Sequence, residues 1–328
     1  MNILITGGAG FLGQRLARQL LARGSLTDAG GTDRSIERIV LLDVVAAQGF
    51  DDPRIRQVVG DFTDPALTEL ALDAETDAVF HLAAVVSGQA EAEFDVGMRV
   101  NLDGSRQLLE RCRDLGHRPR VIFTSSVAVY GGDLPATVPD DLALTPRSSY
   151  GTQKAMAELL LGEYHRRGFV DGRVLRLPTV SVRPGRPNRA ASSFASGIIR
   201  EPLNGLEAVC PVAADTRLWL MSPRRAVDCL VHGHEVASEA LGENRAVNLP
   251  GVTVTAGEMV QRLEEVAGAG VAARVRWERD PEVERIVGSW PGAWDVSRAQ
   301  ALGFAGDADF TGIVRAYIED DLPAKSAG

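Results

Sequence analysis

A tyrosine and a lysine four positions apart could carry out acid–base chemistry together. Tyr150 and Lys154 stand near the start of a helical pattern over residues 149–167, which places both side chains on one helix face. A phenol with a pKa near ~10 is a poor base at neutral pH, but a neighbouring ammonium favours the phenolate. The pair could therefore exchange a proton with a substrate hydroxyl. By itself the motif is more typical of an ordinary surface pair on a helix.

Two serines supply further polar groups for such a site. A buried strand pattern over residues 121–124 runs directly into Ser125 and Ser126. Ligands of open α/β sheets gather beyond the carboxyl ends of the strands. We expect Ser126 to hold the reacting oxygen against Tyr150, with Ser125 as its rival for that role. A purely structural serine at a strand end is the alternative.

A glycine-rich turn near the N-terminus is typical of a dinucleotide-binding loop. The run Thr6-Gly-Gly-Ala-Gly-Phe-Leu-Gly13 follows a strand pattern over residues 2–6 and opens a helical pattern over residues 11–23. Glycine permits the tight turn and lets the main chain approach a pyrophosphate, which the free N–H groups of the helix then bind. The glycines that we assign to the cofactor are Gly7, Gly10 and Gly13.

An acidic residue at the end of the next long strand indicates which dinucleotide binds. Asp43 closes a strand pattern over residues 38–43, later after the turn than the usual ~20 residues, and the polar stretch 24–37 accounts for the delay. Its carboxylate would accept hydrogen bonds from the adenosine ribose and repel a 2′-phosphate. Val44 and Val45 supply no arginine to offset that repulsion. The sequence therefore predicts NAD rather than NADP.

The elements that position these residues alternate between strand and helix. Strand patterns cover residues 2–6, 38–43, 55–59, 78–82, 121–124 and 172–177. This rhythm predicts an α/β fold with a doubly wound parallel sheet, the Rossmann arrangement, over residues 1–178. Residues 179–328 are expected to form mainly a smaller C-terminal α/β substrate domain, although some late strands could rejoin the sheet. Helical patterns there cover residues 190–201, 223–240, 256–267 and 309–319.

Composition and charge exclude several classes of protein. A net charge of −9 would repel nucleic acid at long range, and the chain has no 18-residue apolar run for a membrane span. The three cysteines are far apart and lack the spacing of zinc or disulfide frameworks, so we expect a reducing cytoplasm. His232 and His234 point to different faces of a helix, and no metal is expected. Trp277, Trp290 and Trp294 are interpreted as packing of the smaller domain.

The motifs together resemble the extended short-chain dehydrogenases/reductases, also called the NAD-dependent epimerase/dehydratase family. The resemblance covers residues 1 to about 250. It rests on the glycine turn, Asp43, Asp61-Phe62-Thr-Asp64, His81-Leu-Ala-Ala84, Asn101, Ser125-Ser-Val-Ala-Val-Tyr-Gly131, Tyr150-x-x-x-Lys154 and Leu175-Arg-Leu-Pro178. It implies a nicotinamide-dependent oxidoreductase in which Lys154 also binds the nicotinamide ribose and Tyr150 contacts the cofactor.

The resemblance assigns further residues to NAD. It implies that Phe11 and Leu12 flank the pyrophosphate, Asp61 and Phe62 the adenine, Leu82, Ala83 and Ala84 the linking ribose, and Pro178 the nicotinamide. Asn101 would support the active site and the cofactor from a neighbouring helix, and a purely structural role is an equal alternative. A homodimer is the family expectation, through helices within residues 89–113 and 149–167.

The substrate is less closely defined, because the chain departs from the family after Pro178. Residues 178–185 lack the usual Asn-x-Tyr-Gly-Pro type of sequence, which alters the wall of a nucleotide-sugar pocket. The segments around Ser87, Arg183 and Arg217 resemble a branch that oxidises the C2 hydroxyl of small sugar acids such as D-erythronate. Arginine can bind such a carboxylate in a bidentate manner. A nucleotide-sugar epimerase or dehydratase using the same Tyr150 and Lys154 is the alternative, and a non-catalytic redox-sensing module is a third.

Overall fold

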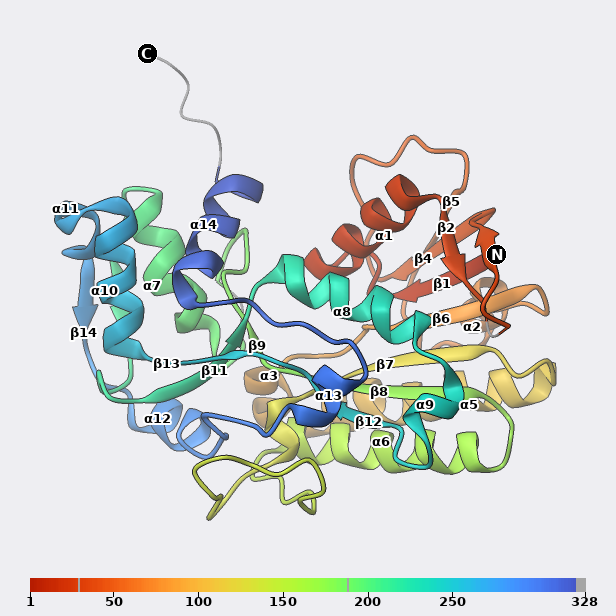
Figure 1. Cartoon of the computed structure of the whole chain (residues 1–328). Coiled ribbons are helices and arrows are strands. Elements are labelled where there is room, and N and C mark those ends of the chain that lie inside the picture. The colour runs from red at the N-terminus through yellow and green to blue at the C-terminus, as the bar shows by residue number, and fades with distance from the viewer. Residues whose placement is uncertain (29, 188, 323–328) are drawn as a thin grey trace.

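Seven parallel strands form the main sheet of the computed structural model, which describes residues 1–28, 30–187 and 189–322. Their order is β12-β8-β7-β6-β1-β4-β5 (Figure 1). The strands are β1 (Asn2–Thr6), β4 (Arg38–Asp43), β5 (Ile55–Val59), β6 (Thr76–His81), β7 (Arg120–Ser126), β8 (Asp171–Leu177) and β12 (Ala246–Asn248). The predicted doubly wound parallel sheet is confirmed, and β12, a late strand, is part of it.

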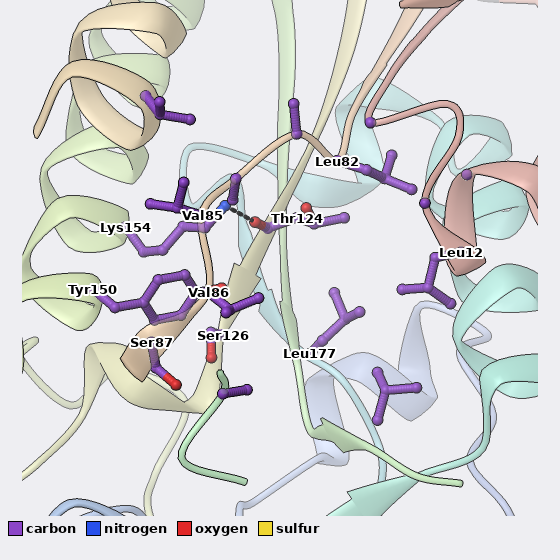
Figure 2. A pocket seen from close by; sticks show the side chains of 18 of the residues that line it. Leu12, Leu82, Val85, Val86, Ser87, Thr124, Ser126, Tyr150, Lys154 and Leu177 are labelled. Atoms are coloured by element: carbon purple, nitrogen blue, oxygen red, sulfur yellow. Dashed lines mark hydrogen bonds between the residues drawn. The ribbon is translucent and has the colours of Figure 1, made fainter. Parts of the chain in front are cut away.

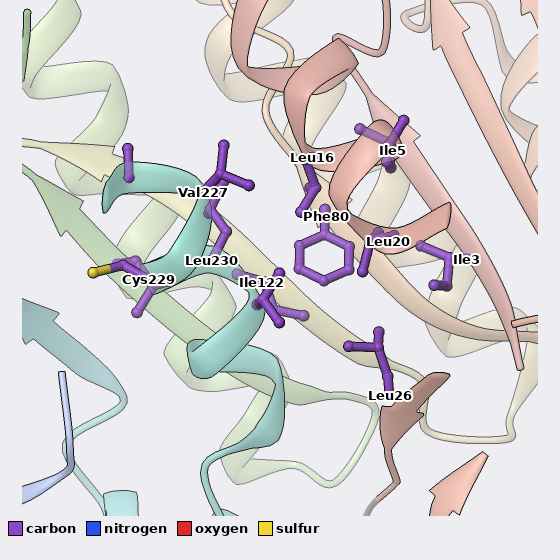
Figure 3. Packing of buried hydrophobic residues seen from close by; sticks show 14 of the residues in the cluster. Ile3, Ile5, Leu16, Leu20, Leu26, Phe80, Ile122, Val227, Cys229 and Leu230 are labelled. Carbon is purple, nitrogen blue, oxygen red and sulfur yellow. The ribbon is translucent and has the colours of Figure 1, made fainter. Parts of the chain in front are cut away.

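Apolar residues on both faces of the strands explain why the sheet is buried between helices. In β1, Ile3 and Ile5 pack on one side with helices α1 (Phe11–Arg23) and α8 (Pro223–Glu235) (Figure 3). Leu4 points to the opposite side, where α2 (Pro65–Ala71), α5 (Gly104–Leu115) and α6 (Ser149–Arg166) cover the sheet. This alternation is what a strand period of two demands when both faces are covered.

The strand order reverses between β1 and β6. From β1 the chain first builds outward through β4 and β5, and then returns to add β6, β7 and β8 on the other side. The carboxyl ends of β1 and β6 are Thr6 and His81, and the connections that follow them diverge to opposite faces. Such a switch point opens a crevice at the carboxyl edge of the sheet, where ligands of this fold bind.

A second, smaller unit covers one end of that edge. It contains a three-stranded sheet, β13-β11-β9, and a strand pair, β10-β14, around a separate apolar core. Its elements are β9 (Thr179–Val180), α7 (Ser193–Leu203), β10 (Ala208–Cys210), β11 (Arg217–Met221), β13 (Val252–Thr255), α10 (Ala256–Ala267), α11 (Ala269–Ala272), β14 (Val275–Trp277), α12 (Pro281–Val287) and α14 (Phe310–Asp320). Helices α8 and α13 (Ser297–Ala301) pack instead with the large sheet, near β12.

Three local patterns differ from what the sequence predicts. The polar stretch 24–37 contains a short hairpin, β2 (Ser25–Thr27) and β3 (Asp33–Ser35). The helical pattern 223–240 is two helices, because the chain leaves helical geometry at Val236 before α9 (Ser238–Leu241). Residues 89–113 are divided among α3 (Ser87–Ala92), α4 (Phe94–Gly97), a π-helical turn η1 (Met98–Asp103) and α5, while η2 (Val127–Val129) follows β7.

Two other observations concern the described residues as a whole. Among residues 1–28, 30–187 and 189–322, no helix has both the length and the apolar composition for a membrane span. The loop after β9 includes residue 188, part of the proline- and glycine-rich run, which lies outside the described residues.

Candidate active site

A cavity of about 570 Å³ lies at the carboxyl edge of the sheet, where β1 and β6 diverge. It extends from the glycine turn past the start of α6 to the smaller unit. The cavity is lined by these residues that the sequence analysis singled out: Gly7, Gly10, Phe11, Leu12, Gly13, Asp43, Asp61, Phe62, Leu82, Ala83, Ala84, Ser87, Ser125, Ser126, Tyr150, Lys154, Pro178 and Arg183. Asn101 and Arg217 do not line it.

The glycine turn provides a cradle that other residues could not form. Gly7 has a φ of +70°, and a Cβ there would lie 2.9 Å from the backbone nitrogen of Ala83. A Cβ at Gly13 would lie 2.2 Å from the Gly7 carbonyl oxygen. Helix α1 starts after Gly10 with no side chain capping it and no acidic residue in its first turn. Its free N–H groups therefore face the cavity, and the turn fits a dinucleotide pyrophosphate.

Two carboxylates line the cavity near the carboxyl ends of β4 and β5. Asp43 accepts hydrogen bonds from the backbone N–H groups of Ala9 (3.0 Å) and Val44 (2.7 Å), so it braces the glycine turn as well as lining the cavity. Asp61 accepts from Arg99 Nη1 (2.6 Å) and from the Thr63 N–H and hydroxyl. Burial alone would raise the pKa of Asp61, but these hydrogen bonds outweigh it and lower the pKa.

Lys154 lies at the centre of the site and is almost fully buried. Its ammonium donates a 2.8 Å hydrogen bond to the Thr124 carbonyl oxygen (Figure 2) and lies 4.5 Å from the centre of the Phe123 ring. Burial lowers the pKa of Lys154 to about 7, and the negative charge of Glu158, one helical turn further on, opposes this shift. A buried cation with so little compensating charge is typical of a functional site.

Tyr150 shares the cavity with Ser126 and Ser87 (Figure 2). Burial raises the pKa of Tyr150 to about 12, while a hydrogen bond with Ser126 and the positive charge of Arg183 lower it. We predicted from the sequence that Lys154 would lower this pKa, and that prediction is wrong in this structure. The physical reason is that the Lys154 ammonium is directed at Thr124 and lies 5.8 Å from the centre of the Tyr150 ring.

The two neighbouring serines have different surroundings. Ser125 is buried and donates its proton to Glu158, which in turn is held by two nitrogens of Arg176. Ser126 is partly exposed to the cavity, where its oxygen accepts from the Ala128 N–H at 3.2 Å and it hydrogen-bonds with Tyr150. The Ser126 hydroxyl therefore faces the phenol, whereas the Ser125 hydroxyl belongs to a buried polar network.

Asn101 lies behind the cavity wall. Its amide oxygen accepts from the Val85 N–H (2.9 Å), and its amide nitrogen donates to the Val85 carbonyl oxygen (3.2 Å) and to Gln153 Oε1 (2.8 Å). It thus joins the connection after β6 to the catalytic helix α6. Asn101 therefore supports the cavity wall from behind and does not itself line the cavity.

Arg183 and Arg217, the two arginines that the sequence offers for substrate binding, have different surroundings in the structure. Arg183 is partly buried in the cavity wall, and its Nη2 donates to Ser192 Oγ at 3.2 Å. Within the described residues no carboxylate forms an ion pair with it. Burial and the charge of Arg200 lower the pKa of Arg183 to about 10, against an opposing effect of Tyr150. Arg217 is exposed at the start of β11 and packs beside Gly292.

Several lining residues were missed by the sequence analysis. Trp290 was interpreted as packing, and it does contact the core of the smaller unit, but it also lines the cavity. Other residues that complete the wall are Val44, Val85, Val86, Val96, Arg99, Val100, Thr124, Thr179, Val180 and Ser192. Most are apolar or lie in loops, where neither periodicity nor residue type distinguishes a cavity wall from ordinary packing. Val85, Val86, Thr179 and Val180 lie close in the chain to Ser87 or Arg183. This was the one signal that could have pointed to them.

Comparison with known proteins decides the family. A model of the NAD dependent epimerase/dehydratase family matches residues 3–219. The chain belongs to this family. The predictions of an NAD-dependent oxidoreductase and of NAD as cofactor are thereby confirmed, and the glycine cradle described above is consistent with them.

Similar proteins of this family include two D-erythronate dehydrogenases. The one from Cupriavidus necator is 67% identical over 325 residues, covering 99% of this chain and 100% of that protein. The one from Haemophilus influenzae is 45% identical over 323 residues, covering 98% and 100%. A crystal structure described as the nucleoside-diphosphate-sugar epimerase from Agrobacterium tumefaciens has 44% identity and a TM-score of 0.89, covering 98% of this chain and 94% of that one.

Proposed function

We propose that this enzyme oxidises the C2 hydroxyl of a small sugar acid with NAD, and that D-erythronate is the substrate, giving 2-dehydro-D-erythronate. The similarity over full length to two D-erythronate dehydrogenases supports this proposal. The single structural observation that carries it is Arg183, a guanidinium in the cavity wall beside Tyr150 that has no carboxylate partner within the described residues. A substrate carboxylate would supply the missing negative charge.

The geometry around Arg183 suits a short acid. A guanidinium can bind a carboxylate through two parallel hydrogen bonds, and among the residues that the structure describes, the Arg183 guanidinium donates only to Ser192. Arg183 acts electrostatically on Tyr150, so an anion bound to it would lie close to the phenol. In a 2-hydroxy acid the reacting hydroxyl is adjacent to the carboxylate. One anchor is therefore enough to place the C2 oxygen between Tyr150 and Ser126.

In the oxidation that we propose, Tyr150 accepts the proton of the C2 hydroxyl. Bound NAD supplies the nicotinamide carbon that accepts hydride from C2. Ser126 donates a hydrogen bond to the substrate oxygen and holds it against the phenol. Lys154, whose ammonium is fixed by the Thr124 carbonyl, would also hold the nicotinamide ribose. The C2–H bond breaks, the carbonyl forms, and the proton leaves through Tyr150.

For the cofactor we propose that residues 1–178 form the NAD-binding domain and residues 179–328 mainly bind the substrate. The residues that would hold NAD are Gly7, Gly10, Phe11, Leu12, Gly13, Asp43, Asp61, Phe62, Leu82, Ala83, Ala84, Tyr150, Lys154 and Pro178. Asn101 would act on them through Val85 and Gln153. Ser87, which is buried at the start of α3, would contact the substrate.

A nucleotide-sugar epimerase is the second candidate, because a solved structure 44% identical to this chain is described as one. The two functions can be separated by incubating the pure protein with NAD and either D-erythronate or a panel of nucleoside-diphosphate sugars. The proposal predicts net formation of NADH with D-erythronate. No NADH with any aldonate, together with epimerisation or dehydration of a nucleotide sugar, would overturn it.

We further propose a homodimer in which α4 and α6 contribute to the interface. Phe94 on α4 and Leu159 on α6 are 57% and 71% exposed, and a partner subunit on these helices would cover both. Sedimentation equilibrium would show a dimer, and a Leu159→Glu variant should weaken it. A monomer at micromolar concentration would refute the proposal. The three buried, unpaired cysteines support the further proposal of a reducing, cytoplasmic environment.

A further inference from the structure

His81 is a buried titratable residue that the reaction described above does not use. It ends β6, it is 2% exposed, and it does not line the cavity. Its Nδ1 lies 2.7 Å from the Thr6 hydroxyl at the end of β1, and its Nε2 lies 2.9 Å from the Ser105 hydroxyl on α5. The imidazole therefore bridges the two strands that open the crevice and the helix that covers them.

The protons of this bridge can be assigned by elimination. Ser105 Oγ lies 2.7 Å from the Asn101 carbonyl oxygen, which can only accept, so the single Ser105 proton is donated there. The contact between Ser105 and His81 then requires an N–H on Nε2. In the neutral ring Nδ1 is an acceptor, and the Thr6 hydroxyl donates to it. Burial and the nearby charge of Lys154 lower the pKa of His81 to about 3, which keeps the ring neutral.

This assignment leaves the Thr6 oxygen free to accept the Ala83 backbone N–H, at 3.2 Å. Ala83 belongs to the connection 82–86, whose residues line the cavity. The same connection approaches the glycine turn so closely that a Cβ on Gly7 would lie 2.9 Å from the Ala83 nitrogen. The Thr6 hydroxyl, together with the hydrogen bond from the Leu82 N–H to the Thr6 carbonyl oxygen at 3.2 Å, thus joins the two backbone segments.

The far end of the bridge reaches the catalytic helix. Asn101, whose carbonyl receives the Ser105 proton, binds both backbone groups of Val85 and donates to Gln153, which lies between Tyr150 and Lys154 in α6. Gln153 is fully buried. Hydrogen bonds through His81, Ser105 and Asn101 therefore connect the glycine turn, the connection 82–86 and α6.

We propose that His81 is a positioning residue for the NAD site: its ring, protonated on Nε2, orients the Thr6 hydroxyl toward Nδ1 so that Thr6 holds the Ala83 N–H and sets the gap between the glycine turn and residues 82–86. This inference rests on the assignment of those segments to NAD, and it adds a role for residues that contact neither cofactor nor substrate. His81 acts through Thr6 and Ala83, because its ring has no access to the cavity.

Two matched pairs of variants test the proposal by titrating NAD without substrate. Thr6→Val removes the hydroxyl with little change of volume, and Thr6→Ser keeps it. His81→Asn keeps an acceptor near the position of Nδ1, whereas His81→Gln keeps a donor toward Ser105 and loses the acceptor for Thr6. We expect Thr6→Val and His81→Gln to raise the Kd for NAD about 3- to 10-fold, the effect of one hydrogen bond, and Thr6→Ser and His81→Asn to stay near the wild type.

The thermal midpoint of each variant separates positioning from general damage. Both His81 variants lose the ring contacts with Phe62 and Phe123, so they should be destabilised to similar extents while differing in Kd. Equal Kd values for His81→Asn and His81→Gln, or wild-type affinity in Thr6→Val, would overturn the proposal. A wild-type protein that binds no NAD would instead refute the cofactor assignment itself.

The tautomer can be measured independently of any ligand. In a protein labelled with 15N-histidine, the two ring nitrogens of His81, identified by their loss in His81→Asn, should report a neutral ring protonated on Nε2 from pH 5 to pH 9. A proton on Nδ1, or titration of the ring within that range, would contradict the assignment.

Discussion

Arg183 and Tyr150 face the same cavity, and the positive charge of Arg183 is one of the two influences that lower the pKa of Tyr150 against the effect of burial. The relationship connects the residue that we propose as the anchor for a substrate carboxylate to the one that we propose exchanges the proton. It also means that an anion bound at Arg183 would partly cancel this lowering of the Tyr150 pKa, while the effect of Ser126 would remain.

Substituting the anchor should affect the substrate more than the cofactor. In Arg183→Gln we expect kcat/KM for D-erythronate to fall about 10- to 100-fold, the loss of a charge-assisted pair, with an unchanged Kd for NAD. Arg217→Gln is the matched control, because Arg217 is exposed and outside the cavity lining. Steady-state kinetics of both variants check this. Equal losses in the two, or a loss only in Arg217→Gln, would remove Arg183 from its assigned role.

Removing the phenolic hydroxyl should stop the chemistry while leaving the fold intact. Tyr150→Phe is expected to lower kcat about 10²- to 10⁴-fold, the usual contribution of a positioned acid or base. Binding of NAD, followed by fluorescence titration, should change little. Ser126→Ala should cause a smaller loss and Ser125→Ala should act mainly on stability, because Ser125 is bound to Glu158. A larger kinetic defect in Ser125→Ala than in Ser126→Ala would reverse the assignment of the two serines.

The burial of Lys154 should lower the free energy of unfolding by an amount that depends on pH. The pKa of Lys154 is about 7 in the folded protein and 10.5 as its ordinary value, so between these pH values the unfolded chain binds more protons. Stability contributed by this group therefore rises with pH across that window, by at most ~1.4 kcal/mol per pH unit. Lys154→Met should be inactive but more stable than the wild type, with the largest gain near pH 7.

Urea unfolding of the wild type and of Lys154→Met at several pH values between 7 and 10 would test this point. Taking the difference between the two proteins cancels the titration of groups that they share. A gain in stability that does not shrink as the pH rises would contradict the linkage.

The glycine cradle predicts a sharp contrast between two glycine-to-alanine variants. Gly13→Ala places a Cβ 2.2 Å from the Gly7 carbonyl oxygen, so the turn must shift and NAD binding should weaken by at least an order of magnitude. Gly162→Ala in α6 meets no atom within 4 Å and should stabilise the helix by roughly 0.5–1 kcal/mol without affecting NAD. Fluorescence titration and thermal melts compare the two. Unimpaired NAD binding in Gly13→Ala would disprove the role of the close approach.

The sequence predicts the large sheet well, because its strands are apolar on both faces and the helices between them have clear periods. It also predicts most cavity residues of the first 178 positions, since the glycine turn and the strand ends carry recognisable polar and small residues. The predictions for Arg217 and for the pKa of Tyr150 failed for specific reasons. Arg217 and Arg183 look equivalent in a sequence, and only the packing of β11 turns the former outward. Whether Lys154 lowers the pKa of Tyr150 depends on where its ammonium points, and the four-residue spacing of the two side chains does not reveal that direction.

Residues contributed by distant loops could not be predicted for a different reason. Trp290 follows α12, far along the chain from Tyr150, and reaches the cavity only because the smaller unit folds over the edge of the sheet. The bridge through His81 likewise depends on three-dimensional neighbours, since its partners Thr6 and Ser105 lie 75 and 24 positions away. No local pattern encodes such contacts.

The central claim is that the enzyme transfers hydride from C2 of D-erythronate to NAD and releases the ketone. The most direct measurement uses D-erythronate carrying deuterium at C2 and follows the label by mass spectrometry of the cofactor and the sugar acid. We expect deuterium in NADH, one equivalent per molecule of 2-dehydro-D-erythronate, and formation of both about 10²- to 10⁴-fold slower in Tyr150→Phe. Deuterium that never appears in NADH while the wild-type protein turns over a nucleotide sugar would contradict it.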